Sequence, residues 1–189
     1  GFYNTAVKVK LTVKDVNFNA DKISVTDNGT EAVLDGDWIL DNDVYTATVT
    51  VDKDAEGSHN IKISGSDNAG VGGVSKNVSF IIDKTIPEVS LSVNGNTYTE
   101  DMGVKFFADT VVVKAYVSDT NEDLGDLRIQ VTKTVPGQQA VTYEYTSTSE
   151  REFTYTDEAD YTINFIAVDK ANNPSAVRTV RFKMDKTAP

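Results

Sequence analysis

The stretch that decides the fold occurs twice in the chain. Residues 67–70 read DNAG and residues 80–87 read FIIDKTIP, and the related strings DKAN and FKMDKTAP occupy residues 169–172 and 182–189. Each position of the second stretch lies 102 residues after its counterpart, as Asp169 follows Asp67. Self-similarity at one fixed period is typical of tandem modules. The 189 residues therefore predict two domains, each large enough to bury its own core.

Apolar and polar residues alternate through both copies, and a period of two is the pattern of half-buried strands. In the second copy, turns rich in Asp, Asn, Gly and Pro separate seven expected strands, at 88–93, 111–117, 127–133, 141–146, 152–155, 161–168 and 176–183. No stretch carries a sustained apolar stripe of helical spacing, and β-branched residues are abundant. The sequence therefore predicts an all-β sandwich with almost no helix.

The first copy repeats this scheme from the second strand onward. Its expected strands lie at 7–15, 23–26, 31–34, 44–51, 60–66 and 75–82. We therefore predict a domain at 1–83 that lacks its first strand, and a domain at 84–189 that ends with the start of a further linker, Asp185–Pro189. An edge left open in this way favours pairing with another chain, and Lys8, Lys10 and Lys14 would counter that tendency.

The linker between the copies is short. It comprises Asp83, Lys84, Thr85, Ile86 and Pro87. Proline fixes its own φ angle and biases the preceding residue toward extended geometry. The sequence thus predicts a stiff joint that sets the spacing of two domains.

Composition excludes several classes of function. The formal net charge of −11 would repel phosphate backbones and anionic lipid heads, and no Lys/Arg run of the kind that follows nucleic acid is present. No apolar run approaches the roughly 20 residues that a membrane helix needs. Cysteine is absent, which excludes disulfides, zinc–thiolate sites and thiol nucleophiles. We expect neither nucleic acid as a partner nor membrane insertion.

Residues 157–163 have the spacing of a tyrosine corner, in which Tyr161 hydrogen-bonds to the backbone a few residues upstream. A shift of 102 residues places His59, the chain's one histidine, at the position of Tyr161. We therefore predict that His59 is a structural corner residue rather than a catalytic one, and that its titration near neutral pH can modulate the turn.

The phrase D-x-A-G-N … F-x-I-D-x-T-x-P resembles the closing strand and linker of the immunoglobulin-like repeats of bacterial cell-surface and secreted proteins. The first copy departs from it with Val71 in place of Asn, and the second with Asn172 in place of Gly. Asn tolerates the left-handed conformation that Gly permits, so the turn can survive the second change. The resemblance implies two tandem immunoglobulin-like β-sandwich domains with Greek-key antiparallel sheets.

The same resemblance implies a non-catalytic spacer or adhesion-stalk module of an extracellular or bacterial cell-surface protein. Neighbouring repeats, and a host or cell-wall glycan or protein, are the implied partners. Some members of this group bind Ca²⁺ near domain junctions, which makes Asp83, Asp67 and Asp119 candidate ligands for calcium, and no other cofactor is implied. Calcium needs six to eight oxygen ligands.

The alternative function is that of a glycan- or protein-binding accessory module of an adhesin or a polysaccharide-degrading enzyme. Flat aromatic rings give apolar contact to sugar faces, and the candidates are Trp38, Tyr143 and Tyr145. Tyr143 and Tyr145 would share one face of a strand, and if that face is the interior they belong to the core. Enzyme signatures such as G-x-S-x-G, the P-loop and H-E-x-x-H are absent, so we predict no catalytic residues.

Overall fold

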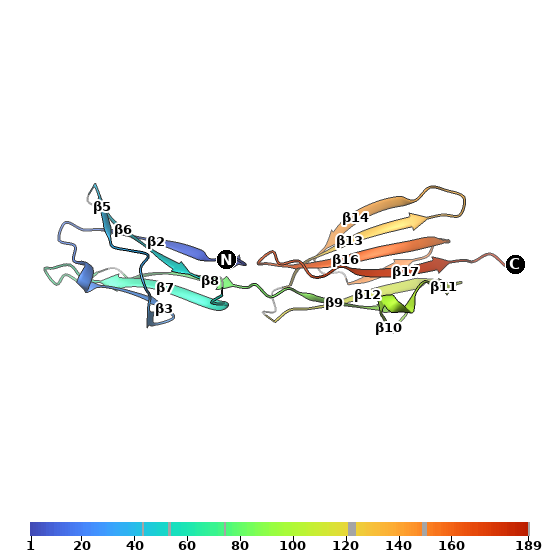
Figure 1. Ribbon diagram of the computed structural model, residues 1–189, viewed down its shortest axis with the longest axis horizontal. Coiled ribbons are helices and arrows are strands. Elements are labelled where there is room, and N and C mark those ends of the chain that lie inside the picture. The colour runs from blue at the N-terminus through green and yellow to red at the C-terminus, as the bar shows by residue number, and fades with distance from the viewer. Residues whose placement is uncertain (43, 53, 74, 121–123, 149–150, 189) are drawn as a thin grey trace. The chain divides into compact units, whose positions relative to one another are not determined.

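The computed structural model describes residues 1–42, 44–52, 54–73, 75–120, 124–148 and 151–188 (Figure 1). Strands make up 59% of the structure and helix 3%. The helical residues within the described ranges form two single 3₁₀ turns, Ala20–Lys22 and Glu100–Met102. The prediction of an all-β chain is confirmed. None of the helices in the described part of the chain has the length and apolar character required to cross a membrane.

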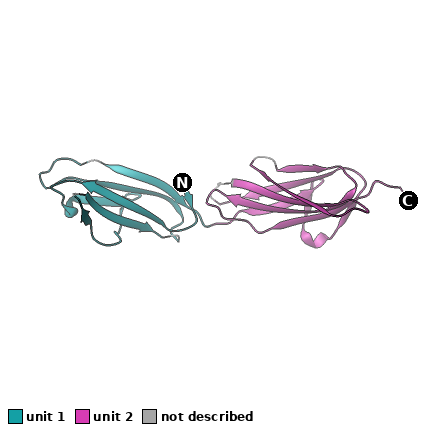
Figure 2. Cartoon of the chain, turned by 90° about the horizontal axis from the view of Figure 1, so that it is seen from above, with its two compact units in different colours: residues 1–84 teal, residues 85–189 magenta. Residues whose placement is uncertain are grey.

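The chain divides into two compact units, Gly1–Lys84 and Thr85–Pro189, which Figure 2 colours separately. We call them unit 1 and unit 2. Pro189, the last residue of the expected second linker, lies outside the described residues.

Unit 1 is a sandwich of two sheets. The five-stranded sheet has the order β1-β8-β7-β3-β4, and the three-stranded sheet has the order β2-β6-β5. Their strands are β1 (Phe2–Tyr3), β2 (Val7–Lys14), β3 (Ile23–Asp27), β4 (Thr30–Glu31), β5 (Ile39–Asp41), β6 (Val44–Val51), β7 (Gly57–Gly65) and β8 (Lys76–Ile82).

Unit 2 repeats this plan, but its smaller sheet has two strands, β9 and β10, on the far side of the counterpart of β2, and no strand among the described residues takes the place of β5. Its sheets have the orders β11-β17-β16-β13-β14 and β10-β9-β12-β15. Their strands are β9 (Glu88–Val93), β10 (Asn96–Tyr98), β11 (Lys105–Phe107), β12 (Val111–Ser118), β13 (Leu124–Thr134), β14 (Val141–Ser147), β15 (Glu152–Tyr155), β16 (Ala159–Asp169) and β17 (Arg178–Met184). Strands β1 and β11 pair in parallel with β8 and β17, and the other pairs are antiparallel.

Strand register shows that the two units are structural copies. The pair Val7↔Val51 between β2 and β6 corresponds to Val111↔Tyr155 between β12 and β15, an offset of 104 residues on both strands. On the last two strands of each unit the offset is 102 residues, because His59↔Phe80 corresponds to Tyr161↔Phe182. The offset changes in the loop before β7, which spans residues 52–56 in unit 1, whereas its counterpart spans residues 156–158.

Each unit has its own hydrophobic core between its two sheets, filled by alternate residues of the strands. The buried core of unit 1 comprises Leu11, Val25, Val49, Val51, Ile61, Phe80 and Ile82. The core of unit 2 contains twenty buried residues among those described, including the aromatic side chains Tyr98, Phe153, Tyr155, Tyr161, Phe165 and Phe182. Unit 2 therefore buries more apolar surface than unit 1 and has the larger hydrophobic contribution to stability.

The D-x-A-G-N phrase forms the turn between the last two strands of each unit. Gly70 has a φ of 77° and Asn172 a φ of 72°, so the expected left-handed residue is present in both copies and is confirmed. Asp169 accepts hydrogen bonds from the backbone and side-chain nitrogens of Asn173, both at 2.7 Å. In unit 1 the carboxylate of the equivalent Asp67 accepts a hydrogen bond from the backbone nitrogen of Val71 at 2.9 Å.

Strands β1 and β5 of unit 1 were not predicted, and two of the predicted strands have other bounds. The strand expected at 31–34 is instead β4 at Thr30–Glu31, because Asn28 and Gly29 have φ angles of 50° and 84° and turn the chain directly after β3. Strand β7 starts at Gly57 rather than at residue 60. The corner residue His59 therefore belongs to a strand and pairs with Phe80.

Candidate functional site

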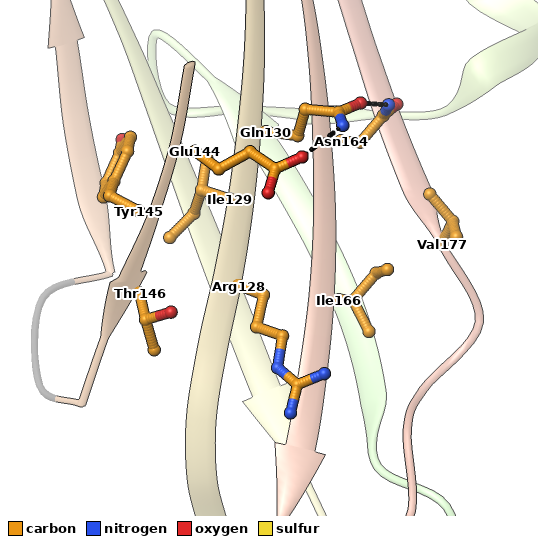
Figure 3. Close-up of a pocket in the computed structure, with 9 residues that line it drawn as sticks. All are labelled: Arg128, Ile129, Gln130, Glu144, Tyr145, Thr146, Asn164, Ile166 and Val177. Carbon is orange, nitrogen blue, oxygen red and sulfur yellow. Dashed lines mark hydrogen bonds between the residues drawn. The ribbon is translucent and has the colours of Figure 1, made fainter.

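A shallow cavity of about 450 Å³ lies on the outer face of the five-stranded sheet of unit 2. Its lining comes from β13, β14, β16 and the segment just before β17 (Figure 3). The lining residues are Arg128, Ile129, Gln130, Glu144, Tyr145, Thr146, Asn164, Ile166 and Val177. Arg128 and Gln130 face outward because the alternate residues of β13, Ile129 among them, are buried in the core.

A row of hydrogen-bonded polar side chains crosses four neighbouring strands at this cavity. Gln130 Nε2 donates to Glu144 Oε1 at 2.6 Å, and Asn164 Nδ2 donates to Gln130 Oε1 at 3.0 Å (Figure 3). Thr179 Oγ1 donates to Asn164 Oδ1 at 2.9 Å. We call Glu144, Gln130, Asn164 and Thr179 the polar row. Because each amide is fixed by two neighbours, the row presents its remaining donors and acceptors in a set orientation.

Next to the polar row, the positively charged side chain of Arg128 lies beside aliphatic side chains. Arg128 is opposite Thr146 on β14 and Ile166 on β16, and the exposed Val177 lies at the edge of the cavity. A guanidinium group, oriented amides and a small apolar floor together can bind hydroxyl, carboxylate or peptide groups.

The cavity does not offer a recognisable catalytic constellation. Among its lining residues Glu144 is the single carboxylate, whereas glycoside hydrolysis ordinarily needs two. In the part of the chain that the structure describes, no three His, Cys, Asp or Glu side chains are grouped so that they could hold a metal ion.

Of the predicted aromatic ligand residues, Tyr145 borders the cavity, whereas Tyr143 and Trp38 do not line it. Tyr145 and Tyr143 stand opposite Ile129 and Val131, on the core-facing side of β14, with nearly parallel rings 6.5 Å apart. Tyr145 packs against Phe153 with ring centres 5.7 Å apart, whereas Tyr143 is 44% exposed. These tyrosines thus do not point to the outer face that carries the polar row.

Trp38 belongs to unit 1, whereas the two tyrosines belong to unit 2. Its ring packs edge-on against Phe18 at 5.2 Å, and Phe18 stacks on Tyr45 at 3.9 Å. Trp38 also packs against the core of unit 1 and is partly buried. This placement is that of a local packing residue.

The two corner residues make equivalent contacts. Tyr161 Oη donates to the carbonyl oxygen of Asp157 at 3.3 Å, and His59 Nε2 lies 2.7 Å from the carbonyl oxygen of Ala55. Each bond reaches four residues upstream. Both rings also stack on the equivalent phenylalanine of the last strand, 4.9 Å apart for Tyr161 and Phe182 and 5.4 Å for His59 and Phe80.

His59 makes one contact that Tyr161 lacks. Its Nδ1 lies 2.6 Å from Asp27 Oδ2, and Asp27 Oδ1 accepts a hydrogen bond from the backbone nitrogen of Asn60. The side chain of His59 is 10% exposed. Burial alone lowers the pKa of His59, but the hydrogen bonds to Asp27 and Ala55 and the charge of Asp27 raise the pKa above its ordinary value. Both ring nitrogens face oxygen acceptors, an arrangement that suits the doubly protonated imidazolium.

The start of the linker is attached to its own sandwich in both units. The backbone nitrogen of Asp83 donates to the carbonyl oxygen of Tyr3 at 2.8 Å, and that of Asp185 donates to Phe107 at 3.0 Å. These bonds extend the parallel pairing of β1 with β8 and of β11 with β17. The side chain of Asp83 is fully buried.

The next linker residue is held by a side-chain contact. Lys84 Nζ donates to Asp54 Oδ1 at 2.8 Å, and this carboxylate raises the pKa of Lys84. Asp54 belongs to the loop before β7, which is the longer one in unit 1. Thr85 and Pro87 open unit 2, and Pro87 is buried.

The two calcium candidates of unit 1 lie at opposite ends of one strand. Asp67 lies in the turn before β8 and Asp83 directly follows β8, so a seven-residue strand separates them by roughly 20 Å at about 3.3 Å per residue. Calcium–oxygen distances are ~2.3–2.6 Å, so these two carboxylates cannot bind the same ion. Asp119 lies in unit 2, after β12. Calcium binding at any one of them stays a prediction.

Sequence reasoning did not find the polar row. The alternation of residues in β13 indicates from the sequence alone that Arg128 and Gln130 share one face of the strand. Which residues lie beside Gln130 depends on strand order and register, which pair it with Glu144 on one side and Asn164 on the other.

The fold is that of an immunoglobulin-like or fibronectin III-like β-sandwich, present twice in tandem. A scan against known protein families found no match, and no curated protein matches the sequence. Among solved structures, a titin fragment aligns with 14% identity over 95% of this chain and 60% of its own, with a TM-score of 0.50. Fibronectin(III)-like modules of Clostridium thermocellum CbhA align with 16% identity over 97% of this chain and 87% of theirs, with a TM-score of 0.45.

Proposed function

We propose that the chain is a non-catalytic structural spacer or adhesion-stalk module of a secreted or bacterial cell-surface protein. Sandwich modules of this class generally serve as structural or binding modules. The chain has no cysteine, so its stability comes from packing and not from disulfides. Neighbouring repeats are its expected partners.

The attachment of the linker carries this proposal. The segment between the last strand of unit 1 and the first strand of unit 2 comprises residues 83–87. Its first two residues are held to unit 1, Asp83 through the carbonyl of Tyr3 and Lys84 through Asp54. Few freely rotating residues remain, and a linker with few free residues limits the range of distances between the domains it joins.

Single-molecule energy transfer tests the spacer. Because the chain lacks cysteine, the substitutions Asp21→Cys and Gln139→Cys place one dye on an exposed residue of each unit. We expect a narrow distance distribution, which broadens when six Gly/Ser residues are inserted after Lys84. A native distribution as broad as that of the insertion variant would contradict the spacer function.

A second candidate function is glycan or protein binding by unit 2, and the polar row favours it. A glycan array and a pull-down with cell-wall fragments test this function. We expect retention by the native chain, loss of retention in Gln130→Ala and Arg128→Ala, and no loss in the control Ser90→Ala, which alters an exposed residue of the other sheet. Retention that depends on Trp38 instead would assign binding to unit 1.

A further inference from the structure

The orientation of the polar row is set from one end, by Glu144. An ionised carboxylate can only accept hydrogen bonds, so Gln130 turns its NH2 group toward Glu144, at 2.6 Å. The side-chain oxygen of Gln130 then faces β16 and accepts from the NH2 group of Asn164 at 3.0 Å (Figure 3). The side-chain oxygen of Asn164 in turn accepts from Thr179. Each amide is therefore held with one defined end toward each neighbour.

After these internal bonds, the polar row keeps polar groups that face the cavity. The NH2 groups of Gln130 and Asn164 each have a second N–H, and Glu144 has its second oxygen, Oε2. Arg128, two residues before Gln130 on β13, adds the N–H donors of a guanidinium group. Within the described residues, neither Arg128 nor Glu144 takes part in an ion pair. The cavity thus combines one charged acceptor with several donors.

Hydroxyl groups match this combination, because a hydroxyl donates and accepts at the same atom. A hydroxyl that donates to Glu144 Oε2 can accept from Gln130, and a hydroxyl on the next carbon can accept from the guanidinium group or from Asn164. A carboxylate ligand could only accept, and Glu144 would repel it. An ammonium ligand could only donate, and Arg128 would repel it.

The charges at the cavity also favour an uncharged ligand. Arg128 and Glu144 are the two charged residues of the lining, and their charges are opposite. Asp126, exposed on the same face of β13, adds a negative charge beside them. An anionic ligand would therefore approach two carboxylates on a chain whose net charge is −11. A neutral ligand can instead form hydrogen bonds with both charged groups, and such bonds are stronger than those between neutral groups.

The apolar part of the lining suits the carbon-bound hydrogens of a sugar ring. Ile166 on β16 is half-buried, and Val177, just before β17, is 49% exposed. Figure 3 shows both beside the guanidinium group and the polar row. The aromatic lining residue, Tyr145, belongs to the core-facing side of β14, so aliphatic groups provide the apolar contact.

We propose that the polar row and Arg128 bind a neutral sugar through a pair of hydroxyl groups on adjacent ring carbons. This inference rests on the second candidate function, glycan or protein binding by unit 2, and specifies the ligand as an uncharged glycan. Glu144 supplies the acceptor, and the two amides and the guanidinium group supply the donors. Acidic glycans and proteins are the competing ligand classes.

NMR titration of the isotope-labelled chain tests the proposal, because the side-chain amide signals belong to the groups that would bind. The probes are linear oligosaccharides of equal length, built of glucose, of mannose or of galacturonate, and every glycan that the array retains. We expect a neutral probe to shift the side-chain NH2 signals of Gln130 and Asn164 saturably. The galacturonate probe should bind more weakly than this neutral probe.

The variant Glu144→Gln separates the neutral class from the acidic class. It replaces the charged acceptor by an amide of similar shape at an exposed position. We expect the variant to weaken neutral-probe binding about 10-fold, the effect of losing one hydrogen bond to a charged group. An acidic glycan would bind the variant more tightly, because a like charge is removed. The matched control is Asp160→Asn, which alters a carboxylate paired with Lys183 on the same face but outside the cavity, and which should leave binding unchanged.

Tighter binding of galacturonate, strengthened further in Glu144→Gln, would overturn the proposal while leaving glycan binding by unit 2 in place. Amide shifts caused by a protein from the pull-down, and by no sugar, would overturn it in favour of protein binding. Absence of amide shifts with every probe would also overturn it. If the array and the pull-down then retain nothing, the second candidate function fails as well. None of these results depends on the distance distribution that tests the spacer.

Discussion

At the scale of single residues, His59 and Tyr161 show that one structural position accepts two chemistries. Both side chains reach a carbonyl four residues upstream and stack on a phenylalanine of the last strand. They differ in titration. Burial raises the pKa of Tyr161, so its hydroxyl remains a donor at neutral pH, whereas His59 changes its charge in a range that experiments reach easily.

The stability of unit 1 should fall as the pH rises above about 6.5, the ordinary histidine value. The pKa of His59 is raised in the folded state, so the folded state binds the proton more tightly than the unfolded state. The resulting stabilisation is complete below the pKa that His59 has in the unfolded state, and it is lost as the pH rises through the pKa of the folded state. The free energy of unfolding falls by no more than about 1.4 kcal/mol per pH unit in this range. Urea unfolding at several pH values, followed by the fluorescence of the single tryptophan, Trp38, measures this.

The variant Asp27→Asn removes the carboxylate that pairs with His59 and should flatten this pH dependence. An unchanged slope in Asp27→Asn would contradict the assignment, because the titration would then arise from another group.

Removal of the corner hydroxyl in Tyr161→Phe should destabilise unit 2 by about 1 kcal/mol, the net contribution of one hydrogen bond. The ring of Phe can still stack on Phe182. Calorimetry measures the change, and Tyr3→Phe, which alters an exposed tyrosine of unit 1, is the control. No loss in Tyr161→Phe, beside a clear loss in Tyr161→Ala, would show that the ring, and not the hydroxyl, supports the corner.

At the scale of elements, the turns between the last two strands differ in strength. Asp169 and Asn173 are buried and share two hydrogen bonds, whereas the carboxylate of Asp67 in unit 1 accepts a bond from the exposed Val71. Because Val71 stands in unit 1 where unit 2 has Asn173, the turn of unit 1 lacks the side-chain hydrogen bond to the aspartate. The left-handed residue Gly70 preserves the shape of the turn.

We expect Asp169→Ala to cost about 3 kcal/mol, because it leaves two buried nitrogen donors of Asn173 without their charged acceptor. The equivalent Asp67→Ala should cost about 1 kcal/mol, because its donor can bind water. Chemical unfolding of the two variants makes this comparison within one chain. Equal losses would indicate that burial of the turn does not matter.

Most strands of five or more residues could be predicted from the sequence, because alternation over that length is a clear signal. The two- and three-residue strands could not, since β1, β5, β10 and β11 are too short to alternate and form only against a neighbour. The corner residues were found because they lie within one local phrase. The polar row was not, because Gln130, Glu144 and Asn164 meet only through cross-strand register.

At the scale of the whole molecule, the two units share a plan but not a core of equal size. The core of unit 1 has fewer buried residues and fewer aromatic rings in the described part of the chain, and the inward face of β2 is incompletely covered. Unit 1 should therefore be the less stable of the two.

Calorimetry of the intact chain should show two transitions, with unit 1 unfolding first. The matched variants Ile61→Ala and Ile163→Ala remove equivalent buried side chains, each at a cost of about 3 kcal/mol. Ile61→Ala should lower only the first transition, and Ile163→Ala only the second. A single transition that both variants shift equally would mean that the units unfold together.

The chain's one imidazole, that of His59, also serves as an intrinsic NMR probe. The Cε1 proton of His59 resonates apart from most other side-chain protons, and the ring stacks on Phe80, whose ring current displaces this signal while the corner is intact. This signal therefore reports the folded fraction and ionisation of one half of a tandem protein, without isotopes or dyes, while the other half contributes no imidazole signal.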